Sequence, residues 1–201
     1  MKFLFIDTSN SFINIYIVRD NEVLIKKKYH TLKDMANSIM PLIRECFNEV
    51  GFKVNNIDKI FVTIGPGSFT GIRVGITVAK TISWSLNIPV YPISTLEYLA
   101  SVNTKYNKII SIIDARRENV FAGYYDSKLN KIKDEEHTNI ESIKKNEDTI
   151  LVSYDGVYDS EIIDVDIVKL INKHINDKSV NPHELNPNYL KKTEAEEKLN
   201  D

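Results

Sequence analysis

The sequence predicts an α/β protein of two related lobes, each built in the order βββαβα, with the second lobe reduced. Two observations support this prediction. In the first half, three strand-like segments precede a helix, a buried strand and a second helix; in the second half, three strand-like segments begin the same order again. We expect residues 1–102 to form the N-terminal lobe and residues 103–201 a reduced C-terminal lobe with a polar C-terminal tail.

The first half contains five segments with the apolar and β-branched composition of strands. These are residues 2–8, 12–18, 22–29, 59–64 and 88–93. Three segments have the apolar spacing of helices, namely residues 34–50, 70–86 and 96–101. Gly51 ends the first helix, Asn87 and Pro89 end the second, and Ser94 or Thr95 is the expected N-cap of the third.

The second half is predicted from the same signals. Strands are expected at residues 108–114, 118–125, 128–137 and 149–153, and helices at residues 139–145 and 166–175. From residue 176 the chain is polar and carries Pro182 and Pro187, so we expect a tail that packs only in part.

The composition is that of a globular protein and excludes several classes of function. Of the 201 residues, 42% are hydrophobic and 27% charged, and the net charge of −2 gives no overall positive field for nucleic acid. The single cysteine, Cys46, excludes an internal disulfide and a cysteine-cluster metal site. No apolar run approaches the ~20 residues of a membrane span, and the N-terminus has the pattern of a strand rather than a signal peptide. We therefore expect a cytoplasmic protein without membrane contact.

The first long helix has a broad apolar surface. At 100° per residue, its apolar side chains share an arc of about 160°, whereas docking on one sheet needs only about 100°. This arc includes Met35, Ile39, Leu42 and Cys46. Two interpretations stay open with equal weight: a helix bedded deeply in one core, or a helix that serves its own sheet and a partner protein.

The second long helix carries small residues every four positions. Gly71, Gly75, Ala79 and Ser83 form a smooth strip along which another backbone can approach closely. We expect this strip at a contact with a partner.

The polar edge of the same helix carries Arg73, Lys80 and Trp84. A tryptophan beside cationic residues is either an edge residue that covers its own sheet or an anchor of a protein interface, where Trp and Arg are enriched. We favour the interface.

A glycine-rich loop links the strand at residues 59–64 to this helix. Its spacing is neither that of a Walker A loop nor G-x-G-x-x-G, so the loop is foremost a tight turn with Ser68 or Thr70 as helix cap. A weak phosphate contact through the backbone is the second interpretation. The residues concerned are Gly65, Gly67, Ser68, Thr70 and Gly71.

The same loop carries a resemblance to a known family. Residues 65–75 read Gly-Pro-Gly-Ser-Phe-Thr-Gly-Ile-Arg-Val-Gly and continue to Ala79 and Lys80, which resembles the signature of the TsaB (YeaZ) family. Residues 5–9, 114–121 and 187–190 resemble further family segments in the same order. Two departures concern the first long helix, where Met35-Ala36-Asn37 replaces a frequent His-Ser-Glu, and the second lobe, which is short.

The resemblance implies an actin-like (ASKHA) fold of two duplicated lobes. It also implies a non-catalytic subunit for the threonylcarbamoyladenosine modification of tRNA at position 37. Such a subunit forms a heterodimer with a TsaD-type catalytic subunit, mainly through its two N-lobe helices, and helps to recruit a TsaE-type ATPase. Contact with tRNA is expected only through the complex.

The residues themselves argue against catalysis. An ATPase of this fold needs glycine-rich loops for phosphate, yet residues 7–11 and 114–117 contain no glycine. No histidine pair has the His-x-x-x-His spacing of the metal-binding catalytic relatives, so we expect no metal and no cofactor. Asp7 could bind a cation weakly, and Arg116 with Arg117 could bind phosphate, although a turn rich in charge is the favoured explanation for all three.

Two rival functions stay open. One is a stand-alone small ATPase or kinase of the same fold, with Asp7 and residues 65–71 at the phosphates. The other is a homodimeric interaction module, in which the exposed helices pair with a second copy. A peptidase has no support, because Ser68 has no identifiable base.

Overall fold

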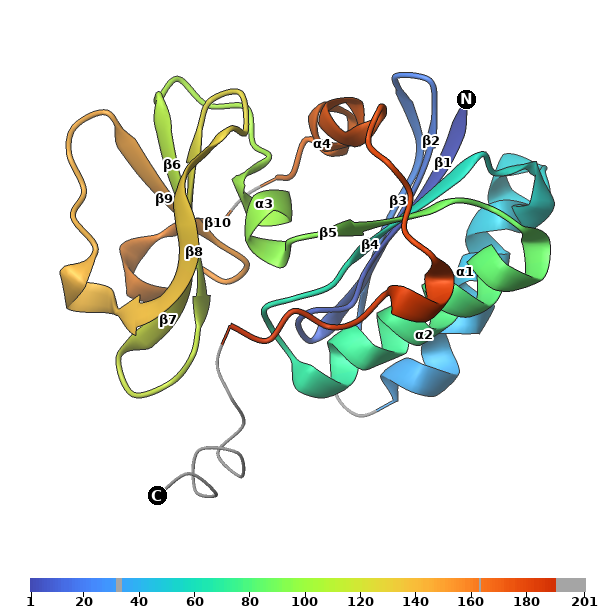
Figure 1. The fold of residues 1–201 in the computed structure, drawn as a ribbon, viewed down its shortest axis with the longest axis horizontal. Coiled ribbons are helices and arrows are strands. Elements are labelled where there is room, and N and C mark those ends of the chain that lie inside the picture. The colour runs from blue at the N-terminus through green and yellow to red at the C-terminus, as the bar shows by residue number, and fades with distance from the viewer. Residues whose placement is uncertain (32–33, 163, 191–201) are drawn as a thin grey trace.

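The computed structural model describes residues 1–31, 34–162 and 164–190. Two lobes lie side by side, each centred on a five-stranded mixed sheet (Figure 1). The first sheet has the order β3-β2-β1-β4-β5 and contains β1 (Lys2–Asp7), β2 (Phe12–Arg19), β3 (Glu22–His30), β4 (Lys59–Thr63) and β5 (Val90–Ile93). The second has the order β10-β9-β6-β7-β8 and contains β6 (Lys108–Asp114), β7 (Asn119–Asp126), β8 (Lys131–Asn139), β9 (Thr149–Ser153) and β10 (Glu161–Ile162).

The two sheets repeat one topology. Read from its other edge, the second sheet has the order β8-β7-β6-β9-β10, which matches the first strand for strand. In each sheet the first strand pairs antiparallel with the second and parallel with the fourth. The predicted α/β fold of two related lobes is therefore confirmed.

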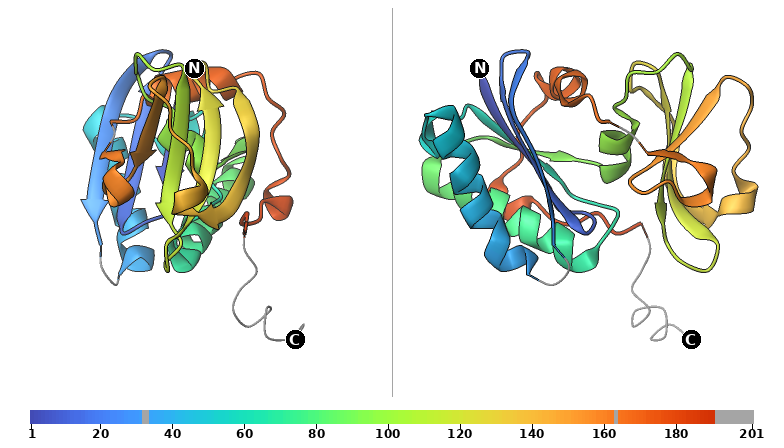
Figure 2. Two further views of the ribbon diagram at one scale, coloured as in Figure 1. Left: turned by 90° about the vertical axis from the view of Figure 1, so that its left-hand side faces the viewer. Right: turned by 180° about the vertical axis from the view of Figure 1, so that it is seen from behind.

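The two long helices cover one face of the first sheet. α1 (Met35–Val50) and α2 (Phe69–Leu86) contact each other, and both contact strands of that sheet (Figure 2). Gly51 ends α1 with a φ of 72°, and Asn87 ends α2 with a φ of 54°, both in the left-handed region that closes a helix. Ser68 caps α2 by accepting a hydrogen bond from the Gly71 N–H, as predicted.

Two short helices lie where the lobes meet. α3 (Thr95–Ala100) contacts β6 and β7, and α4 (Ile167–His174) contacts β3. A single hydrophobic core joins the lobes there, because Phe3, Phe5 and Tyr16 of the first sheet pack with Ile109 and Val152 of the second. No described helix is both long enough and apolar enough to cross a membrane.

The reduced second lobe differs from the prediction between β8 and β9. The expected helix at residues 139–145 is only the 3-10 turn η2 (Ile140–Ser142). The two apolar side chains of this turn bury too little surface to offset the free-energy cost of nucleating an α-helix. Three other 3-10 turns are present, namely η1 (Val54–Asn56), η3 (Val157–Asp159) and η4 (Pro182–Glu184).

The chain after α4 returns to the first lobe. Val180 forms an antiparallel bridge with Val90 of β5, and η4 lies against α2 (Figure 1). Leu185 is buried in the core of the first lobe. The lobe boundary near residue 102 stays a prediction, and the expected polar tail lies outside the described residues from position 191 onward.

An ion-pair cluster ties α4 to α3. Glu97 accepts from Lys173 Nζ at 2.6 Å and lies 3.0 Å from His174 Nε2, while His174 Nδ1 lies 2.6 Å from Asp177. Burial lowers the pKa of His174, but hydrogen bonding and charge from Glu97 and Asp177 outweigh burial, so the net pKa is raised.

The raised pKa of His174 predicts a pH-dependent stability. The folded chain holds the imidazole proton more tightly than the unfolded chain, so the stabilisation is complete below the ordinary pKa of about 6.5. It is lost as the pH rises through the raised pKa of His174. Urea unfolding at several pH values should show this fall, and His174→Gln should flatten it; an unchanged slope in the variant would exclude His174 as the cause.

Candidate functional site

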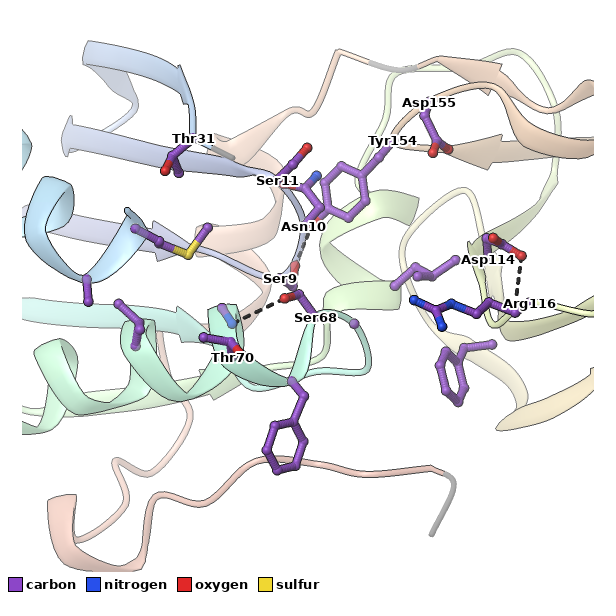
Figure 3. Close-up of a pocket in the computed structure, with 18 of the residues that line it drawn as sticks. Ser9, Asn10, Ser11, Thr31, Ser68, Thr70, Asp114, Arg116, Tyr154 and Asp155 are labelled. Carbon is purple, nitrogen blue, oxygen red and sulfur yellow. Dashed lines mark hydrogen bonds between the residues drawn. The ribbon is translucent and has the colours of Figure 1, made fainter. Parts of the chain in front are cut away.

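The candidate site has two parts, a buried carboxylate at the lobe junction and a groove above it. The groove has a volume of about 860 Å³ and is lined by the β1–β2 turn, the start of α2, the β6–β7 turn and the end of β9. Figure 3 shows Ser9 and Ser68 on one wall and Arg116 on the other. We refer to it as the lobe groove.

Asp7 ends β1 below this groove and is fully buried. Its Oδ1 accepts hydrogen bonds from Thr63 Oγ1 at 2.7 Å and from the Ser9 N–H at 3.1 Å, and also from Ser9 Oγ. Its Oδ2 accepts from Asn14 Nδ2 at 2.8 Å and from Tyr154 OH at 2.9 Å. The donors come from β2, β4 and the second lobe, so one carboxylate joins three segments that are distant in sequence.

Two buried tyrosines, Tyr16 and Tyr98, and the half-buried Tyr154 lie near the carboxylate. Tyr154 OH lies 2.8 Å from Ser9 Oγ, and Tyr16 OH lies 3.1 Å from Tyr98 OH. Burial raises the pKa of Tyr16 to about 12 and the pKa of Tyr98 and Tyr154 well above the ordinary value. All three therefore keep their protons at neutral pH, and Tyr154 can act as a donor to Asp7.

The donors leave Asp7 no access to a ligand. A carboxylate that coordinates a cation needs a free lone pair facing the cation, whereas Asp7 has five donors and no exposed surface. Cation or nucleotide binding by Asp7 stays a prediction, and in this structure the lone pairs of its carboxylate already accept hydrogen bonds. Among the described residues, no group of three or more His, Cys, Asp or Glu side chains could hold a metal ion.

The first part of the glycine-rich turn packs against the chain, whereas Ser68 and Thr70 are exposed and line the lobe groove. The Ser68 N–H donates to the Ser9 carbonyl at 2.7 Å, and the Gly65–Pro66 peptide bond is cis. Gly67 has a φ of 149°, and a Cβ on it would lie 2.4 Å from the Ser9 carbonyl oxygen. Glycine is needed at this position because the backbone of the β1–β2 turn comes so close.

The small-residue strip of α2 serves an internal contact. A Cβ on Gly71 would lie 2.0 Å from the Thr8 carbonyl oxygen, and one on Gly75 would lie 2.3 Å from Thr8 Oγ1. Thr8 Oγ1 in turn donates to the Gly71 carbonyl at 2.8 Å. The strip therefore lets α2 approach the end of β1, and the expected contact of Gly71, Gly75 and Ala79 with a partner stays a prediction.

The apolar arc of α1 is likewise used inside the lobe. Ile39 and Cys46 are fully buried and Leu42 is 5% exposed, so none of the three can contact a partner. The fully buried Ala79 of α2 belongs to the same core. Burial raises the pKa of Cys46 to about 11, consistent with a packing role. Of the expected interface residues, only Met35, Arg73, Lys80 and Trp84 reach the surface.

The two arginines after β6 have different positions. Arg116 lines the lobe groove opposite Ser68 (Figure 3), whereas the exposed Arg117 is not part of its lining. Both arginines and Glu118 have positive φ, and the Arg116 N–H donates to Asp114 at 3.0 Å. Asp114 and Asp155 also line the groove, which offsets the attraction of Arg116 for an anion.

Sequence reasoning missed the partners of Asp7. Asn14 and Thr63 are polar residues inside strands that are otherwise apolar, and each is buried. A buried polar side chain requires a hydrogen-bonding partner, so the polar residues Asn14 and Thr63 in apolar strands indicate buried hydrogen bonds. The sequence around Tyr154 gives no such indication, because its partner Asp7 lies 147 positions away.

A second, shallow groove lies between α1 and α2 on the outside of the first lobe. Its described lining is Ala36, Phe69, Thr70, Arg73, Val74, Thr77 and Val78. Phe69 is 43% exposed, and Met40, one turn beyond Ala36 on α1, is 50% exposed. We call these lining residues together with Met40 the α1–α2 face.

Comparison with known proteins agrees with the motifs and the fold. The family model described as TsaD, tRNA N6-adenosine threonylcarbamoyltransferase, matches residues 24–161, more than half of the chain. The tRNA threonylcarbamoyladenosine biosynthesis protein TsaB of Bacillus subtilis (strain 168) is 39% identical over 129 residues, which is 64% of this chain and 56% of that protein. The chain belongs to the TsaB (YeaZ) family.

Other TsaB relatives show the same extent of match. The TsaB protein of Escherichia coli (strain K12) is 28% identical over 135 residues, 66% of this chain and 58% of that protein. The match therefore spans just over half the length of these curated relatives.

Solved structures share the two-lobe fold. YeaZ from Pseudomonas aeruginosa has a TM-score of 0.80 at 21% identity and covers 94% of this chain and 99% of that one. A second structure, described as similar to peptidase YeaZ from Pseudomonas aeruginosa, has a TM-score of 0.82 at 20% identity with the same coverage. This similarity and the repeated sheet order confirm the predicted actin-like fold of the TsaB family.

The contact between Gly75 and Thr8 gives a prediction. Gly75→Ala should lower the free energy of unfolding by about 1–3 kcal/mol, because the added methyl group meets the Thr8 hydroxyl. Thr8→Ala removes that hydroxyl, so the double variant should recover part of the loss. Urea unfolding of the two single variants and the double variant measures the coupling, and strictly additive losses would contradict the contact.

The hydrogen bond from Tyr154 to Asp7 gives another prediction. Tyr154→Phe should lower the free energy of unfolding by about 1–3 kcal/mol, because it removes a donor to a buried carboxylate. Tyr158→Phe is the matched control, since this exposed hydroxyl lies 3.4 Å from Asp114. Denaturant unfolding compares the two, and equal stability of both variants would show that the buried bond contributes nothing.

Proposed function

We propose that this chain is a non-catalytic scaffold in the threonylcarbamoyladenosine modification of tRNA. In this proposal it pairs with a TsaD-type catalytic subunit through the α1–α2 face. The observation that carries the proposal is the saturated Asp7 carboxylate, because it leaves the lobe groove without a free acidic ligand at the end of β1. The role in this tRNA modification is proposed because the TsaB relatives are named for tRNA threonylcarbamoyladenosine biosynthesis.

The amide groups at the start of α2 also argue against phosphate chemistry in the lobe groove. The Ser68 N–H already donates to Ser9, and the Gly71 N–H donates to Ser68 Oγ. An ATPase loop needs such amides free to approach phosphate. The stand-alone ATPase or kinase stays as the rival proposal, and stabilisation of the purified chain by ATP would revive it.

The exposed apolar residues of the α1–α2 face support docking. Met40 is 50% exposed and Phe69 43% exposed, so neither side chain is buried in the core of the first lobe. Apolar side chains grouped on one surface are typical of a protein interface. The same face could pair two copies of this chain, and sedimentation of the isolated protein tests that homodimer.

The remaining parts of the proposal come from the family resemblance. A TsaE-type ATPase would join the pair, and tRNA would be reached through the complex. The net charge of −2 supports an indirect contact with tRNA. Trp84, which is 68% exposed near the end of α2, is a further proposed anchor for a partner.

The docking proposal predicts a selective effect of surface substitutions. Met40→Asp should weaken binding to the TsaD-type protein of the same cell by at least about tenfold, because burying an unpaired carboxylate is costly. Ile132→Asp on β8 is the matched control, since Ile132 is 52% exposed and Met40 50%. Isothermal titration of the two purified proteins measures both constants.

A second pair of substitutions tests charge. Exchange of Arg73 and Lys80 for glutamate should also weaken binding to the TsaD-type protein, because both cationic side chains reach the surface of α2.

Affinity capture with the tagged wild-type chain is the first experiment on the scaffold proposal as a whole. If no TsaD-type protein is recovered and titration shows no binding, the scaffold proposal fails.

A further inference from the structure

The last described segment of the chain lies along α2. We call residues 180–190 the strap (Figure 1). The Val180 N–H donates to the Val90 carbonyl at 3.1 Å, and the Asn188 N–H donates to the Ile64 carbonyl at 2.7 Å. Leu185, between these two bonds, is only 2% exposed. These two backbone hydrogen bonds and the buried side chain of Leu185 attach the strap to the first lobe.

Beyond these attachments the strap places Tyr189 at the start of α2. The Tyr189 and Phe69 rings are stacked with centroids 5.3 Å apart and planes inclined by 22°. Arg73 Nε donates to Tyr189 OH at 2.9 Å, and the Arg73 guanidinium lies 3.8 Å from the centroid of the Phe69 ring. Each of the three side chains therefore contacts the other two.

This cluster is on the surface. Phe69 is 43% exposed and Tyr189 is 42% exposed, so the stack does not serve the core. Phe69 and Arg73 also line the α1–α2 face. An aromatic pair with a guanidinium at the edge of an apolar groove has the composition of an interface hot spot.

The charge of Arg73 indicates what the face binds. Within the described lining of the groove, Arg73 is the residue that carries a charge. Its guanidinium contacts a phenol oxygen and an aromatic ring, and no described carboxylate neutralises it. An acidic side chain on a partner could therefore form an ion pair with this guanidinium, which is already oriented by its two aromatic contacts.

We propose that Tyr189 is a positioning residue of the α1–α2 face. It holds Arg73 over Phe69, so that the face presents an apolar groove with an oriented cation at its edge. The partner surface that fits is an apolar helix face with a carboxylate placed opposite Arg73. This inference rests on the proposed function, because it assigns a part of the strap to the same docking surface.

The reason Tyr189 matters is conformational. A free arginine side chain samples many rotamers, and ordering it on binding costs affinity. The hydrogen bond and the stack restrict Arg73 before the partner arrives. Removal of the phenol ring should therefore weaken binding even though Arg73 itself is retained.

The test is titration of the TsaD-type protein with the full-length chain and three variants. Tyr189→Ala should weaken binding by at least about tenfold. Tyr189→Phe keeps the stack on Phe69 but removes the hydrogen-bond acceptor for Arg73, so its binding should lie between that of the wild type and that of Tyr189→Ala. Tyr29→Ala is the matched control on β3, where Tyr29 is 45% exposed, and it should bind as the wild type does.

A double-variant cycle separates positioning from a direct or structural effect. If Tyr189 acts through Arg73, the losses from Tyr189→Ala and Arg73→Ala are less than additive in the double variant. Binding of the wild type should weaken with added salt, and this dependence should be smaller for Tyr189→Ala. Thermal unfolding of each variant tests whether the first lobe is retained.

The outcomes distinguish the two proposals. A wild-type chain that does not bind the TsaD-type protein overturns the scaffold and this inference together. A wild-type chain that binds while Tyr189→Ala binds equally well overturns only the role of Tyr189. Additive losses in the cycle, or an unchanged salt dependence, overturn the positioning of Arg73 by Tyr189.

Discussion

The buried carboxylate of Asp7 is the interaction on which the rest of the structure depends. Asp7 has no exposed surface, and an isolated charge in such a place is strongly unfavourable. Donors from the β1–β2 turn, β2, β4 and the second lobe offset that cost. The same hydrogen bonds set the positions of the two sheets relative to each other, since Tyr154 reaches Asp7 across the junction. A carboxylate that accepts these hydrogen bonds has no free lone pair for a cation. The contact that joins the two lobes therefore also supports the proposed lack of catalysis.

The end of β1 also determines how α2 is placed. Thr8 follows Asp7 directly, and it meets α2 at Gly71 and Gly75 with no room for a side chain at either position. Ser9, the next residue, holds the glycine-rich turn through the Ser68 N–H. Three consecutive residues thus connect the first sheet, the signature loop and the second long helix, so the family signature is explained by close packing of backbone segments.

Because internal packing uses the strip of α2 and the arc of α1, the surface proposed for a partner is narrower than the apolar area of the two helices suggests. It consists of the residues left outside, such as Met40 and Phe69, with the cation of Arg73 at the edge. The strap adds Tyr189 from the far end of the chain. Since the proposed docking surface is assembled from α1, α2 and the strap, it would form only in a completely folded first lobe.

The sequence by itself determined the α/β class, the three strands that open each lobe, and the ends of both long helices, because periodicity, glycine, asparagine and proline act over a few residues. It also identified the signature loop and Ser68 as a helix cap. Only the tertiary structure decided that Asp7 is saturated, that the α2 strip faces Thr8, and that Tyr189 contacts Phe69. Each of these depends on residues separated by long stretches of chain, such as Asp7 and Tyr154, which lie 147 positions apart. A hydrophobic arc shows how much surface a helix buries, but which neighbour buries it follows from the packing of the whole lobe.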